Sequence, residues 1–168
     1  MTTGLQSAHD PPGPPQHRPR IKIYRFQLIG LPFLAALPIL ALLGVFGERW
    51  DAVAASDGSL AATVHYPTAL RYKMIDEIEM LVSNRGGAVI DTVTVALDTA
   101  YASRFSTINA VPQFTRPFEI GLAQIQPGES RRVRIEIQGE RYWSHSGELT
   151  FRSATDTVRI HLTTMVFP

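Results

Sequence analysis

Hydrophobic and polar positions follow two different patterns along the chain, and the change lies near residue 47. Residues 26–46 read FQLIGLPFLAALPILALLGVF and carry no charge. A helix of this length is about 31 Å long, which matches the hydrocarbon thickness of a bilayer. Gln27, at the start of the segment, is its only polar side chain, so such a helix has no polar face to turn toward water. We therefore predict a transmembrane helix over 26–46.

Beyond residue 60, apolar and polar residues alternate, as they do in β-strands that bury one face. Turn-forming sequences at 84–87, 127–130 and 153–156 separate the alternating runs. The pattern predicts an all-β domain over 60–168, an antiparallel β-sandwich of about seven strands. The residues expected to face its core include Ile78, Met80 and Val82, then Val89, Val93, Val95 and Leu97, then Val133, Ile135 and Ile137.

The order of motifs in this region resembles a known kind of domain. A strand ending in VSNRGG is followed by a valine-rich strand, a long variable stretch, LAQIQPGESRRVRIEI and then SGELTF. This order is similar to that of immunoglobulin-like domains of the bacterial cell-adhesion-related type, over about residues 60–167. The resemblance implies an immunoglobulin-like module that binds partners or acts as a spacer, and it carries over no catalytic residue.

Charged residues beside the apolar segment predict its orientation. Four bases precede it, whereas the residues that follow it are of mixed charge, and positive flanks stay in the cytoplasm. The bases are Arg18, Arg20, Lys22 and Arg25. We expect a disordered, proline-rich, basic cytoplasmic tail over 1–25, a juxtamembrane linker over 47–59, and the β domain on the periplasmic side of the plasma (inner) membrane.

A cleaved signal peptide is the alternative to a retained anchor. Residues 52–54 read AVA, a pattern of small residues after which signal peptidases cut, so cleavage would follow Ala54. Signal peptides normally carry an apolar run of about 7–15 residues, which is shorter than the run over 26–46. Three charged residues also separate the run from the cleavage pattern: Glu48, Arg49 and Asp51. We favour the anchor.

Composition removes several classes of chemistry. The chain has no cysteine, which excludes disulfides, thiolate metal sites and cysteine nucleophiles. An amino-terminal anchor and an outward immunoglobulin-like domain are similar in outline to the copper-delivering assembly proteins of cytochrome oxidase, but those need paired thiolates for Cu(I). His65, His145 and His161 are too scattered for a local metal motif. We expect no metal, no cofactor and no catalytic residue. The sequence has no basic patch that would indicate nucleic-acid binding.

Two segments hold more aromatic residues than surface loops need, at 101–118 and 142–145. Aromatic side chains with a polar end favour interfaces, so we predict a partner-binding surface on both segments. The alternative is that their rings fill the core. The candidate residues are Phe105, Ile108, Phe114, Tyr142, Trp143 and His145.

The predicted function is that of a non-enzymatic accessory or scaffolding subunit, anchored in the lipid bilayer, that contacts an integral membrane or envelope protein complex. A cell-surface adhesion or carbohydrate-binding module is the alternative, and a small envelope enzyme is a third class.

Overall fold

The computed structural model describes residues 25–43, 47 and 49–168, without the side chains of 25–29, 107 and 108. The chain divides into two units, 1–39 and 40–168, and each is described by itself. The expected cytoplasmic tail over 1–25 lies almost entirely outside the described residues.

Helix α1 (Arg25–Leu42) begins one residue before the apolar segment, covers most of it and contains Pro32 and Pro38. Its described side chains are largely exposed: Leu31 and Phe33 are each 70% exposed and Leu42 is 87% exposed. Residues 44–46, the end of the expected transmembrane helix, lie outside the described residues. Among the helices that the structure describes, none meets the combined length and hydropathy of a membrane span.

The rest of the described chain is mostly β-strand, as predicted. Nine strands form one hydrogen-bonded sheet, and a one-turn helix, α2 (Thr99–Ala102), follows the fourth. The strands are β1 (Arg49–Asp57), β2 (Leu60–Arg71), β3 (Ile75–Asn84), β4 (Ile90–Leu97), β5 (Phe105–Val111), β6 (Glu119–Ile125), β7 (Ser130–Gly139), β8 (Trp143–Arg152) and β9 (Thr157–Phe167).

The two strands beyond the expected seven are β1 and β5. Strand β1 occupies most of 47–59, where we expected a linker. Most of its side chains are exposed, so its sequence gives little indication of a strand. Its backbone pairs with β2 across the turn at Gly58 and Ser59. Strand β5 lies within the long connection at 101–118 and pairs with β7.

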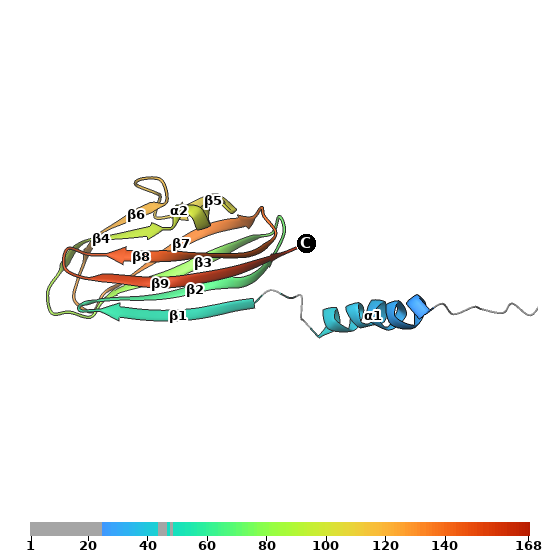
Figure 1. Cartoon of the computed structure of the whole chain (residues 1–168). Coiled ribbons are helices and arrows are strands. Elements are labelled where there is room, and N and C mark those ends of the chain that lie inside the picture. The colour runs from blue at the N-terminus through green and yellow to red at the C-terminus, as the bar shows by residue number, and fades with distance from the viewer. Residues whose placement is uncertain (1–24, 44–46, 48) are drawn as a thin grey trace, which may run out of the picture. The chain divides into compact units, whose positions relative to one another are not determined.

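The sheet curls because β2 passes from one set of strands to another. Residues 60–65 of β2 pair with β3, whereas residues 69–71 pair with β9 in the parallel direction. Pro67, which has no N–H to donate, lies between the two stretches. No hydrogen bond to β3 or β9 is therefore lost at this position. The strand order is β5-β7-β3-β2-β9-β8-β4-β6, and β1 lies outside β2 (Figure 1). Inward residues from both halves of this order share one core, which makes the domain sandwich-like.

Strands β3 and β7 bury the residues that the alternation predicts. Ile78 pairs with Ile135, and both are nearly inaccessible, as are their inward neighbours on the two strands.

The prediction that Val89 faces the core is wrong. Val89 precedes β4 and is 44% exposed, and Ile90 takes the core position. The inward face shifts because β4 has two consecutive exposed residues, Asp91 and Thr92. Its partner β6 has two as well, and one of them, Gln124, has a left-handed φ of 47°. Such local irregularities change which face a side chain takes.

Candidate functional site

Two turns meet at one end of the β domain. The turn after β2 carries Tyr72, Lys73 and Met74, and the turn after β7 carries Tyr142. The Lys73 N–H donates to the Gly139 carbonyl at 2.9 Å, so the turn after β2 is joined through its backbone to the end of β7, where the second turn begins. The rings of Tyr72 and Tyr142 lie against each other with centroids 4.7 Å apart.

This end of the domain exposes large apolar side chains from both turns and from the strands that follow them. Trp143 is 74% exposed, and Ile75 is 58% exposed. We call this surface the aromatic end; its residues are Tyr72, Met74, Ile75, Tyr142 and Trp143. Clustered exposed apolar side chains typically mark a contact surface.

The backbone at the aromatic end is held in an unfavourable conformation at two positions. Lys73 has a φ of 64° and Trp143 a φ of 82°, in the left-handed region that non-glycine residues rarely adopt. Such strain persists only where surrounding contacts impose it, and it is concentrated at functional sites. The Lys73 N–H bond to the Gly139 carbonyl constrains the first of these positions, and the indole of Trp143, at the second, is exposed to solvent.

The predicted site residues divide between the surface and the core. Tyr142 and Trp143 lie on the surface. Phe105, in contrast to the prediction, does not lie on the surface, because it is only 5% exposed. Its ring packs against Tyr101, with centroids 4.8 Å apart, and edge-on against His145, with centroids 5.8 Å apart. The structure therefore brings the two predicted segments together, but Phe105 joins them from inside the domain.

The remaining candidates are more enclosed or less fully described. His145 is half-buried, and its Nε2 donates to the Arg141 carbonyl at 2.8 Å, which fixes the ring against the turn after β7. Phe114 is half-buried and packs edge-on against Phe118. The side chain of Ile108 lies outside the described residues.

Tyr72, Met74 and Ile75 were not among the residues predicted from the sequence. A signal was present, because the stretch RYKMI places aromatic and apolar residues at a turn between two strands, where polar residues are usual. The signal was weak without knowledge that Tyr142 lies beside Tyr72.

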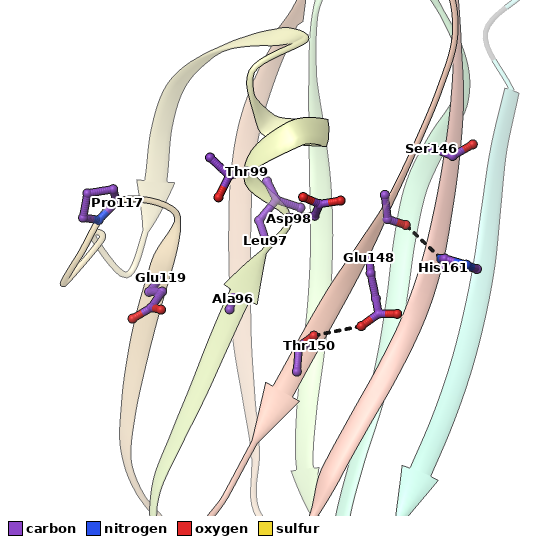
Figure 2. A pocket seen from close by; sticks show the side chains of 11 residues that line it. Ala96, Leu97, Asp98, Thr99, Pro117, Glu119, Ser146, Glu148, Thr150 and His161 are labelled. Carbon is purple, nitrogen blue, oxygen red and sulfur yellow. Dashed lines mark hydrogen bonds between the residues drawn. The ribbon is translucent and has the colours of Figure 1, made fainter.

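A polar depression of about 620 Å³ lies elsewhere, on the outward face of β4, β8 and β9 (Figure 2). Its titratable groups already have partners, and one of them, Glu119, lies 4.0 Å from Arg116. The Asp98 carboxylate accepts from the Ala100 N–H at 2.9 Å, Glu148 accepts from Thr150 and lies 3.7 Å from Arg159, and His161 Nδ1 donates to the Gly147 carbonyl. Within the part of the chain that the structure describes, no group of three potential metal ligands is present.

No protein-family model matches the chain, and no curated protein matches it. Among solved structures, the cupredoxin domain of amoB from Nitrosocaldus yellowstonii has a TM-score of 0.39 and 7% identity, with 56% of each chain covered. The VesB protease of Vibrio cholerae has a TM-score of 0.33 and 12% identity, with 79% of this chain and 35% of that chain covered. A β-glucosidase from Listeria innocua has a TM-score of 0.36 and 15% identity, with 73% and 16% covered. The chain thus spans little more than half of the first of these proteins and less of the others, and TM-scores this low assign no family.

Proposed function

We propose that the chain is a non-enzymatic accessory or scaffolding subunit, anchored by an amino-terminal helix over 26–46. In this proposal an immunoglobulin-like β domain on the outer side of the plasma membrane binds an integral membrane or envelope protein. The observation that carries the proposal is the aromatic end, with Trp143 74% exposed on a strained backbone.

Partner binding gives a physical reason for this exposure. Contact with a partner removes the apolar area of Tyr142 and Trp143 from water, and Trp and Tyr are the side chains that most often dominate the binding energy of an interface. The two tyrosine rings support each other at 4.7 Å, so little side-chain freedom remains to be lost on binding.

The course of the chain supports a partner at the membrane. Arg49, the first residue of β1, pairs with Ala69 near the end of β2 that leads to Tyr72, so the chain enters the β domain toward its aromatic end.

The test is co-purification of the full-length chain after mild detergent extraction. Trp143→Ala should lose a stoichiometric membrane partner without a change in melting temperature. Leu81→Ala is the matched control, because Leu81 is also exposed but lies on a strand outside the aromatic end. Equal retention by both variants would refute the site, and selective retention of a glycan by the wild type would favour the adhesion module instead.

A further inference from the structure

Strand β1 presents a regular, unpaired backbone edge. Within the described residues it pairs with β2 alone, along its whole length, from Asp57↔Leu60 to Arg49↔Ala69. The pair next to a two-residue turn is hydrogen-bonded, and bonded and non-bonded pairs then alternate. Odd-numbered residues of β1 therefore bond to β2, while residues 50, 52, 54 and 56 direct their N–H and C=O groups to the free side. The Ala52 N–H fits this assignment, since it donates to the neighbouring Asp51 carboxylate at 2.8 Å.

The other two edges of the described sheet are blunted. Strand β5 has a register shift between Thr107 and Asn109 and is followed by Pro112. Strand β6 is closed by its own preceding loop, because the Thr115 N–H donates to the Glu119 carbonyl, and it is distorted at Gln124. Irregular strands and prolines are the means by which proteins protect sheet edges. Strand β1 has no proline and is regular from residue 50 onward.

The sequence of β1 is complementary to itself in the antiparallel direction. If Val53 faces Val53 of a second copy, all residues of β1 find a partner, and the outward-directed Ala52 faces the outward-directed Ala54. The same register sets Arg49 opposite Asp57 at both ends. Opposite charges facing each other across strands are favourable. Arg49 and Asp57 are both exposed, and neither makes an ion pair within the described part of its own chain. The Asp57 carboxylate accepts a hydrogen bond from the Thr157 N–H at 3.0 Å, which leaves its charge unpaired.

We propose that the chain forms a two-fold symmetric dimer in which β1 pairs antiparallel with β1 of a second copy, with the axis at Val53. Each Ala52 N–H exchanges the Asp51 carboxylate for the Ala54 carbonyl of the other copy. The strand order becomes continuous from β3 and β2 through both copies of β1 into the second domain. This interface is separate from the aromatic end and does not depend on the proposed function.

The absence of native cysteine allows a direct test with the full-length chain in detergent. Val53→Cys should give a disulfide-linked dimer on mild oxidation, because facing residues of a non-bonded antiparallel pair have Cα atoms about 4.5 Å apart, within the range of disulfides. Ala123→Cys, at an exposed position on β6, is the control for random collision and should remain monomeric. No cross-link at Val53, or equal cross-linking at Ala123, would overturn the proposal.

Two further variants in the Val53→Cys background test the register. Ala54→Pro removes an N–H that points to the free edge and none that bonds to β2, so it should abolish the cross-link while the melting temperature stays within a few degrees. Arg49→Glu places like charges opposite each other at both ends and should weaken dimerisation about ten-fold. A cross-link that survives both substitutions would show that the two copies meet in another way.

Discussion

The Tyr101 hydroxyl donates to Thr164 Oγ1 at 2.8 Å, and the Thr164 hydroxyl donates to the Pro67 carbonyl, also at 2.8 Å. Since the threonine proton goes to the carbonyl, the tyrosine is the donor in the first bond. Both side chains are almost inaccessible, and Gly147 makes room for the Tyr101 ring because a Cβ there would overlap it. Helix α2 and β9 are thereby tied to the point where β2 passes from β3 to β9.

Removing this hydroxyl should destabilise the domain. We expect Tyr101→Phe to lower the free energy of unfolding by about 1–2 kcal/mol, because a buried hydrogen bond is lost and the Thr164 oxygen loses its donor. Chemical denaturation measures the change. Tyr142→Phe, at an exposed tyrosine, is the matched control and should change the stability little. Equal stability of the two variants would contradict the role given to the Tyr101 bond.

The same tyrosine should make stability fall in alkali. Burial raises the pKa of Tyr101 to about 12, whereas an unfolded tyrosine titrates near 10. The folded state then holds its proton more tightly than the unfolded state, so the contribution is complete below pH 10 and is lost as pH rises from about 10 to 12. Over this interval the wild type should lose about 2–3 kcal/mol more than Tyr101→Phe. Parallel pH profiles for the two proteins would argue against this titration.

Asp156 should give a dependence of opposite sign in acid. The Ser59 hydroxyl donates to its Oδ2 at 2.6 Å and holds the pKa of the carboxyl below its usual value. The stabilisation is present above the unfolded pKa of about 3.9 and is lost as pH falls through the folded value. In an NMR titration, Ser59→Ala should raise the pKa of Asp156, whereas Ser144→Ala on exposed β8 should leave it unchanged. An unchanged pKa in Ser59→Ala would rule out the hydroxyl as the cause.

The strain at Trp143 gives a prediction that separates stability from binding. Glycine adopts a φ of 82° without penalty, so Trp143→Gly should leave the melting temperature unchanged or raise it by a few degrees while partner retention is lost. A marked fall in melting temperature would mean that the indole supports the fold and would remove it from the proposed interface.

The orientation of the chain is tested by a reporter fused after Pro168. The four bases before the apolar segment predict activity of the reporter outside the cytoplasm only. Activity confined to the cytoplasm would reverse the proposed topology, and a mature protein that begins at Ala55 would identify the segment as a cleaved signal.

The sequence by itself determined the inward faces of the regular strands. Ile78 on β3 and Ile135 on β7 could be placed in the core because successive side chains of a strand point to opposite faces, so period-two alternation is a local property. The turn sequences between these runs are local as well, which is why seven of the nine strands were expected. The same reasoning failed at Val89, since a distortion shared by two paired strands shifts the face without a mark in either sequence.

Three features depended on the tertiary structure alone: the existence of β1, the burial of Phe105 and the assembly of the aromatic end. Strand β1 is held by its pairing with β2 along its whole length, and only Val53 and Ala55 of its side chains pack against the core. Phe105 is buried because Tyr101 and His145 cover it, and His145 arrives from a distant part of the sequence. Tyr72 and Tyr142 meet because backbone bonds join the turn after β2 to the end of β7. Contacts between residues so far apart arise from strand pairing over long sequence separations, which local periodicity does not encode.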